Sequence, residues 1–172
     1  MEKELHWHVA YVKSCQEKKA RDMLINDGVE CYLPIHKVKH KWSDRLKTIE
    51  KLVLPRMIFI RTTLAKRIDV IRSIPGITKY MSNGGAFNPV IIPDKQMELF
   101  MTMVENSSEG TSVEVRTEPL APGDTVEITD GPMKGMKCEL LKIKDKTKIA
   151  VRLEMLGTAM MEISSDIVKK ID

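Results

Sequence analysis

The sequence predicts an α+β protein in which an amino-terminal split-βαβ plait, with a four-stranded antiparallel sheet and helices, is joined by a linker to a small five-stranded β-barrel. Up to residue 105, segments with strand periodicity alternate with segments of helical periodicity. After residue 118, short β-branched runs are separated by glycine and proline. The Ser-, Thr- and Glu-containing stretch 106–118 predicts the linker. We therefore expect domains at 1–105 and 119–172.

The first predicted strand, residues 5–13, is rich in aromatic and β-branched side chains. Strand alternation groups four of them on one face: Leu5, Trp7, Val9 and Tyr11. Ser14 and Glu17 then have the spacing of a capping box, which predicts the start of a helix. Gly28 is suited to the left-handed position that ends it.

Two further strands are predicted at residues 29–38 and 51–62, the second interrupted by Pro55. A helix then follows, with apolar residues at helical spacing up to Pro75 and Gly76: Leu64, Ile68, Ile71 and Ile74.

The first domain is completed by one strand and one helix. Residues 77–81 predict the strand, and Asp94 can cap a helix that runs to about Glu105. This helix has an apolar face of Met97, Phe100, Met101 and Val104. The resulting order of β, α, β, β, α, β, α is typical of the split-βαβ plait.

The second domain contains five short strand candidates: 125–128, 137–143, 148–153, 158–163 and 167–171. So many strands in so short a segment predict a small barrel. The segment 123–143 carries turn residues that could provide the sharp reversals: Gly123, Gly131, Pro132 and Gly135.

Composition narrows the class of protein. Hydrophobic residues at 42% and charged residues at 30% are typical of a folded globular chain. We expect no membrane span, because no apolar run is long enough, and a cytoplasmic location, because the amino terminus is charged. Cys15, Cys31 and Cys138 are widely spaced and predict reduced thiols. Without ligand spacing or nucleophile and phosphate-loop motifs, we expect no metal, no cofactor and no enzyme activity.

The basic charge is concentrated in the first domain. Residues 1–105 hold 18 Lys and Arg against 12 Asp and Glu, whereas residues 106–172 hold 10 against 12. Residues 36–51 are especially basic and predict a hairpin tip that contacts nucleic acid, with these candidates: Lys37, Lys39, Lys41, Trp42, Arg45 and Lys47. A solvated hairpin would explain the same residues.

Ordered motifs cover nearly the whole chain. PGDTVEITDGPMKGMKCELLKI at 122–143, with LEMLG following, resembles the KOW motif and its SH3-like barrel in NusG-type transcription elongation factors. The first half resembles the NusG amino-terminal (NGN) domain, with its motifs in the same order: W-x-V-x-Y at 7–11, Pro34, LPRMIFI at 54–60, PGI at 75–77 and VIIPD at 90–94.

This resemblance implies a factor that binds the clamp helices of RNA polymerase and suppresses pausing or termination. The implied contact residues are Tyr11 and Phe59 first, then Trp7, Met57, Ile58 and Tyr80, with Arg67, Asp69 and Arg72 near the positions that reach the polymerase gate. Core filling is the alternative explanation for several of the apolar candidates, and solvated helix charges for the last three.

Departures from the family pattern favour a specialised paralogue of the RfaH or UpxY type, for example at surface polysaccharide loci. Arg56 and Met57 replace the usual Gly-Tyr, and Cys138 replaces a glycine. A housekeeping NusG and a ribosome-associated KOW-type RNA-binding protein remain alternatives. The resemblance also implies a ribosomal protein or the termination factor Rho as partner of the barrel. The β-branched residues of this domain predict that it is always folded as a barrel.

Overall fold

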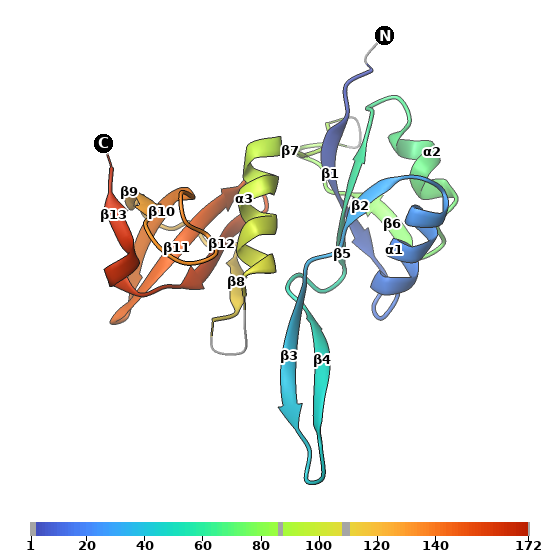
Figure 1. Cartoon of the computed structure of the whole chain (residues 1–172). Coiled ribbons are helices and arrows are strands. Elements are labelled where there is room, and N and C mark those ends of the chain that lie inside the picture. Colours follow the sequence, from blue (N-terminus) through green and yellow to red (C-terminus); the bar gives the residue numbers. More distant parts are fainter. Residues whose placement is uncertain (1–2, 86–87, 108–110, 172) are drawn as a thin grey trace. The chain divides into compact units, whose positions relative to one another are not determined.

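The computed structural model describes residues 3–85, 88–107 and 111–171, which divide into two compact units (Figure 1). The first unit contains the described residues up to Pro34 together with Leu54–Met97. The second contains Ile35–Val53 and the described chain from Glu98 onward. None of the helices in the described ranges combines the length and the apolar character that a membrane span requires.

An antiparallel sheet forms the first unit. Its strands run in the order β2 (Glu30–Tyr32), β5 (Met57–Thr62), β1 (His6–Val12) and β6 (Ile77–Tyr80). This path confirms the predicted four-stranded antiparallel sheet. A further two-residue strand, β7 (Ile91–Ile92), pairs with β1 and was not predicted, because two residues are too few to show periodicity.

Helix α1 (Glu17–Asn26) packs against β2 and β5, and Gly28 ends it with a φ of 74° as predicted. The predicted capping box is wrong. The N-cap residue is Gln16, which makes no side-chain capping bond, and Ser14 lies before the left-handed Cys15. The buried Glu17 carboxylate instead accepts a hydrogen bond from the backbone N–H of Arg56 at 3.1 Å. The local pattern assigns Glu17 to a helix cap. Because Glu17 is buried next to β5, its carboxylate binds the Arg56 backbone instead.

Helix α2 (Arg67–Arg72) is shorter than the predicted apolar run, and it packs against β6. None of its residues is buried, and Ile68 is 39% exposed, so the apolar spacing here does not mark a buried face. Helix α3 (Asp94–Glu105) has the predicted bounds. Met97, Phe100 and Val104 are buried as predicted. Met103 is buried as well, whereas the predicted Met101 is only partly buried.

The charged segment between the second and third predicted strands forms a hairpin of its own. Strand β3 (Ile35–Lys41) pairs with β4 (Leu46–Leu52) in an extended ribbon (Figure 1). The N–H of Trp42 donates to the carbonyl of Arg45 across the turn at 2.8 Å. Leu33 and Pro34 separate β2 from β3, so the predicted strand 29–38 is in fact two strands.

All five predicted barrel strands are present: β9 (Asp124–Ile128), β10 (Lys137–Ile143), β11 (Lys146–Leu153), β12 (Gly157–Glu162) and β13 (Val168–Lys170). A short 3₁₀ helix, Ser165–Ile167, precedes β13. The strand order is β13-β9-β10-β11-β12-β8.

The sixth strand, β8 (Val113–Arg116), lies in the segment predicted as linker and pairs with β12. Its Val-Glu-Val alternation is a strand pattern, and Val113 is only 5% exposed. Residues 108–110 of the predicted linker lie outside the described residues. The strands of the barrel sheet therefore begin before residue 119, although the domain division itself stays a prediction.

Candidate functional site

A surface depression of about 410 Å³ lies at the end of strands β1 and β5. It is lined by Tyr11, Val12, Lys13, Pro55, Arg56, Met57 and Thr78. Tyr11 and Met57 are directly opposite each other in the β1–β5 register, and Tyr11 is opposite Lys79 in the β1–β6 register. The Lys79 ammonium lies 5.8 Å from the centroid of the Tyr11 ring, within reach of a cation–π contact. The depression thus combines partly exposed apolar side chains with a cation at its rim.

The segment that precedes β5 is held in a constrained conformation. Arg56 has a φ of 66°, which is uncommon for a residue other than glycine. Its N–H donates to the Glu17 carboxylate, and its carbonyl accepts from the N–H of Val12 at 2.8 Å. These two hydrogen bonds fix the backbone of Arg56, and with it the placement of the neighbouring Pro55 and Met57. The sequence pattern gave no sign that Glu17 has this role.

A second depression, of about 370 Å³, adjoins the first at Thr78. It is lined by Arg67, Ile68, Ile71, Thr78, Lys79, Tyr80, Ser82 and Pro89. The Tyr80 hydroxyl donates to the carbonyl of Arg67 at 2.7 Å, which ties α2 to β6. Asp69 and Arg72 do not line this depression; they form an exposed ion pair at 3.8 Å, of the kind that contributes little to stability.

Four of the predicted contact residues lie in the core of the first unit. Phe59 and Ile58 are fully buried, while Trp7 and Tyr80 are 5% and 8% exposed. By register, Trp7 and Phe59 share the sheet face of Tyr11, whereas Ile58 and Tyr80 lie on the opposite face. These four side chains therefore fill the core of the first unit, which is the alternative explanation that the sequence offers for such residues. The continuous apolar run of β5 was the available signal, since strands buried on both faces read this way.

His8 is a buried polar residue of the first unit. It is fully buried on β1, and within the described part of the chain neither ring nitrogen has a partner in hydrogen-bond geometry, although backbone groups of Thr62 and Val90 face it. Burial, aided by the charges of His6 and Arg67, lowers the pKa of His8 to about 4. His8 is therefore neutral at physiological pH and belongs to the core.

The nucleic-acid candidates are all exposed and all lie on the β3–β4 hairpin: Lys37, Lys39, Lys41, Trp42, Arg45 and Lys47. Trp42 is 50% exposed, and its ring meets that of His40 edge-on at a centroid distance of 5.4 Å. The sequence therefore located an exposed basic hairpin correctly. The contact of Trp42 with His40 follows from strand alternation, which places residues two apart on one face.

The predicted turn residues lie around strands β9 and β10. Gly131 and Gly135 have φ values of 85° and 89°, which glycine adopts without strain. At Gly123 a Cβ atom would come within 1.9 Å of the Leu140 carbonyl oxygen, so close packing rather than a positive φ requires glycine. Pro132 is exposed in the same turn.

A charged pair on the neighbouring strands β10 and β11 holds the segment that leads to Gly123. The Arg152 guanidinium donates to both oxygens of the Glu139 carboxylate at 2.8 Å, and also to the carbonyls of Leu120 and Ala121 at 3.1 Å. The N–H of Gly123 donates to the same carboxylate at 2.6 Å. The hydrogen bonds from Arg152 hold the pKa of Glu139 below its usual value. Sequence analysis missed this pair, since its members lie on different strands.

Among the described residues, no group of three or more His, Cys, Asp or Glu side chains is arranged to hold a metal ion. Burial raises the pKa of the Cys138 thiol to about 11, which keeps that thiol protonated.

Comparison with known proteins identifies the family. The family model described as "Transcription termination factor nusG" matches residues 5–101, and the KOW motif model matches residues 122–154. The chain belongs to the NusG family. Its two matched regions correspond to the NusG amino-terminal region and to the KOW motif. The first match contains both depressions, and the second contains the turn residues of the barrel.

The similar proteins are distant. The chain is 24% identical to the transcription termination/antitermination protein NusG of Streptomyces coelicolor, over 96% of this chain and 61% of that protein. It is 21% identical to NusG of Streptococcus pyogenes serotype M3, over 88% of both chains. A solved structure concerning domain interaction in Thermotoga maritima NusG covers 98% of both chains with a TM-score of 0.53 and 20% identity, which supports the fold alone. The chain thus spans less than two thirds of the Streptomyces protein's length.

Proposed function

We propose that this NusG-family chain acts in the cytoplasm as an elongation and antitermination factor that binds RNA polymerase. The observation that carries the proposal is the accessible depression around Tyr11 and Met57, which lies within the NusG match. The resemblance to the family implies contact with the clamp helices at these two positions. Partly exposed apolar side chains beside cations suit a protein–protein interface, where a few anchors supply most of the affinity. Arg67, Asp69 and Arg72 would face the polymerase gate.

The test is co-purification of RNA polymerase with the full chain and with variants confirmed to be folded. Tyr11→Ala combined with Met57→Ala should weaken binding roughly thirtyfold, the equivalent of ~2 kcal/mol for a buried anchor. Ile25→Ala is the matched control, because Ile25 is an apolar residue that is 60% exposed in the same unit but outside the depression. Equal polymerase recovery with the double variant and the wild type would reject the proposed interface.

Phe59 is not suitable as a test residue, because its side chain is fully buried. Loss of polymerase binding after Phe59→Ala would therefore reflect unfolding as readily as a lost contact. Trp7 and Ile58 have the same drawback. The interface proposal thus rests on Tyr11 and Met57, with Pro55 and Arg56 beside them.

Operon specialisation is the finer part of the proposal. Arg56 and Met57 give this depression a charged and flexible character where the family commonly has Gly-Tyr. Mapping of chromatin occupancy in source cells would test it. Occupancy confined to a few operons, such as surface polysaccharide loci, is expected, whereas occupancy along most transcribed genes would indicate a housekeeping NusG.

The proposal assigns a partner to two further parts of the chain, the basic hairpin and the barrel. The basic hairpin would contact nucleic acid near the polymerase, and the barrel would recruit a ribosomal protein or Rho. Met155, 60% exposed with a φ of 60° in the turn before β12, offers the barrel an apolar contact. Co-sedimentation with ribosomes in the absence of polymerase would favour the ribosome-associated alternative instead.

A further inference from the structure

Strand β8 is an edge strand in the middle of the segment that connects α3 to β9. It pairs with β12 along its whole length and, within the described part of the chain, with no other strand. Val113 is 5% exposed, but the other residues of β8 are only half-buried. A short edge strand with a single buried side chain is held weakly, so β8 can detach at a lower cost than the central strands of the barrel.

The chain that follows β8 is held more firmly. The Arg152 guanidinium donates to the carbonyls of Leu120 and Ala121, and its paired bonds to Glu139 fix the guanidinium itself. Leu120 also packs against a buried apolar cluster of the barrel. Leu120 and Ala121 therefore form a fixed end, and β8 lies on the free side of it.

The docking of β8 depends on a glycine at the start of β12. Gly157 has a φ of 140°, and a Cβ atom there would come within 2.3 Å of the Arg116 carbonyl oxygen and 3.2 Å of the Thr117 Cα. A side chain at this position would push the end of β8 away from β12. The close approach of the two strands thus requires glycine for its small size as well as for its backbone conformation.

A charged bridge adds to the docking of β8. The Glu114 carboxylate accepts hydrogen bonds from the Lys148 ammonium at 3.1 Å and from the Arg116 guanidinium at 3.0 Å. Lys148 belongs to β11, so the bridge joins β8 to a strand beyond its direct partner. Because Glu114 is partly exposed, this bridge contributes only modestly to stability and does not prevent release.

The start of β8 is held by a residue of the hairpin base. His36 Nε2 lies 3.1 Å from the Val113 carbonyl oxygen, which can only accept, so Nε2 is the donor. His36 Nδ1 lies 2.7 Å from the Ser107 hydroxyl, in the chain that follows α3. The imidazole is buried. One side chain of the hairpin is therefore bonded to two points of the segment between α3 and the barrel.

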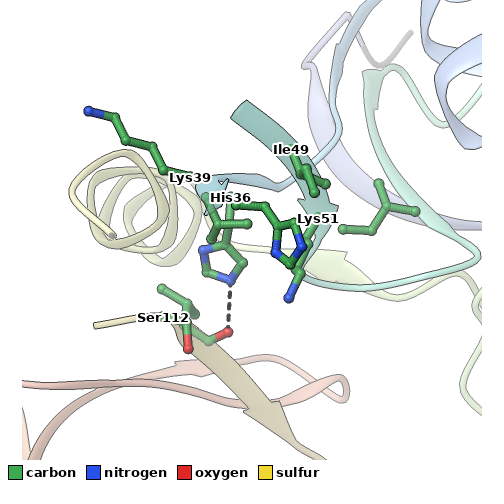
Figure 2. Close-up of a pocket in the computed structure, with 9 residues that line it drawn as sticks. His36, Lys39, Ile49, Lys51 and Ser112 are labelled. Carbon is green, nitrogen blue, oxygen red and sulfur yellow. Dashed lines mark hydrogen bonds between the residues drawn. The ribbon is translucent and has the colours of Figure 1, made fainter. Parts of the chain in front are cut away.

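The hairpin base and β8 are otherwise loosely packed. A cavity of about 280 Å³ lies between them, lined by hairpin residues that include Val38 and Ile49 and by Ser112 and Val113 (Figure 2). Atoms that line a cavity lack the contacts that a packed apolar interface would supply. The hold of the hairpin on β8 therefore depends mainly on the hydrogen bonds of His36.

We propose that β8 is a releasable strap that sets the reach of the barrel. Docked on β12, the strap attaches the barrel to the hairpin base through His36. Released, it adds residues 113–119 to the free chain between α3 and the barrel, roughly 20–25 Å when extended, while Arg152 keeps its hold on the fixed end. The barrel can then meet partners farther from α3. This inference concerns the connecting segment and does not depend on the proposed contact with RNA polymerase.

Hydrogen exchange of the β8 amides in the full chain measures the release of the strap. Gly157→Ala should speed this exchange roughly tenfold or more, because the new Cβ atom meets the Arg116 carbonyl. His36→Leu should speed it roughly threefold to tenfold, since the bond to Val113 is lost. His36→Gln retains a side-chain donor and should recover part of the protection. The amides of β9, β10 and β11 should be unchanged.

Each variant has a matched control. Gly131 also has a positive φ, of 85°, but no atom lies within 4 Å of a Cβ placed there, so Gly131→Ala tests backbone strain without the clash. His40→Leu replaces an exposed histidine of the same strand, β3, as the control for His36→Leu. Small-angle X-ray scattering of the same proteins measures reach, and the released strap should increase the maximum dimension of the molecule.

The outcomes decide the inference without reference to polymerase. Faster β8 exchange and a larger maximum dimension in the Gly157 and His36 variants, and in neither control, support the strap. Exchange of β8 only together with β9, β10 and β11 in every variant would make β8 a permanent barrel strand and overturn the inference. Unchanged β8 exchange in His36→Leu, or faster exchange without a larger dimension, would overturn it as well. If Gly157→Ala unfolds the barrel, His36→Leu decides alone.

Discussion

Strand β5 and the β3–β4 hairpin adjoin in sequence, yet their candidate residues have opposite environments. In β5, Ile58 and Phe59 are fully buried, although the family resemblance suggested them as contacts. In the hairpin, every predicted nucleic-acid candidate is exposed. The difference teaches that a motif identifies a functional segment, while the periodicity within it indicates which side chains are accessible. An uninterrupted apolar run predicts burial on both faces, and a charged run predicts exposure.

The largest effect should come from truncating the core of β5. Phe59→Ala should destabilise the first unit by about 3–5 kcal/mol, because a fully buried aromatic side chain leaves a cavity. Urea unfolding followed by Trp7 fluorescence, in a Trp42→Phe background, measures this change. Tyr11→Ala, at a partly exposed position on the same sheet face, should cost clearly less. Similar losses for the two variants would contradict the assignment of Tyr11 to the surface.

His8 should make the stability of the same core depend on pH. Its pKa is about 4 in the folded chain against an ordinary value of 6.5, so the unfolded chain binds more protons between these values. The stability from neutral His8 is complete above pH 6.5 and decreases as the pH falls to about 4, by roughly 3 kcal/mol. Urea unfolding at several pH values should show this slope.

The control for the pH effect is the pair His8→Met and His40→Gln. His8→Met removes the titrating group and should flatten the slope, whereas His40→Gln, on the exposed hairpin, should leave it unchanged. A slope that persists in His8→Met would assign the pH dependence to other groups.

The barrel should respond to loss of Arg152 by a smaller amount. Arg152→Ala removes the paired bonds to Glu139 and those to two carbonyls, and should cost about 1–3 kcal/mol. Arg152→Lys should recover only part of this, because an ammonium group cannot reproduce the planar bidentate geometry. Thermal melting by circular dichroism gives the stability, and faster exchange of the Gly123 amide would locate the effect. Unchanged exchange in Arg152→Ala would show that the pair does not hold this segment.

The smallest stability effects should be in the hairpin. Lys47→Ala and Lys41→Ala are exposed and should each change the free energy of unfolding by less than ~0.5 kcal/mol. Urea unfolding of the two variants checks this. A larger loss for either lysine would mean that the hairpin charges contribute to folding. A change in nucleic-acid binding by that variant would then include an effect of lower stability.

Much of the architecture could be predicted because it depends on local patterns. The four strands of the sheet path, helix α3 and all five predicted barrel strands follow periodicity and turn chemistry. The errors occurred where a long-range contact overrode a local preference. Glu17 binds the backbone of Arg56 instead of capping its helix, and β8 pairs with β12 inside the predicted linker.

The sequence by itself determined the family, the two types of domain and the exposed basic hairpin, because motif order, side-chain alternation and charge are properties of the chain. Only the tertiary structure decided which candidates remain accessible. Packing on both faces of the sheet buried Phe59. Register placed Tyr11 beside Met57 and Lys79, and put Trp42 on the face of Lys47. The register relations depend on which strands pair, and a shift of one residue would have reversed them.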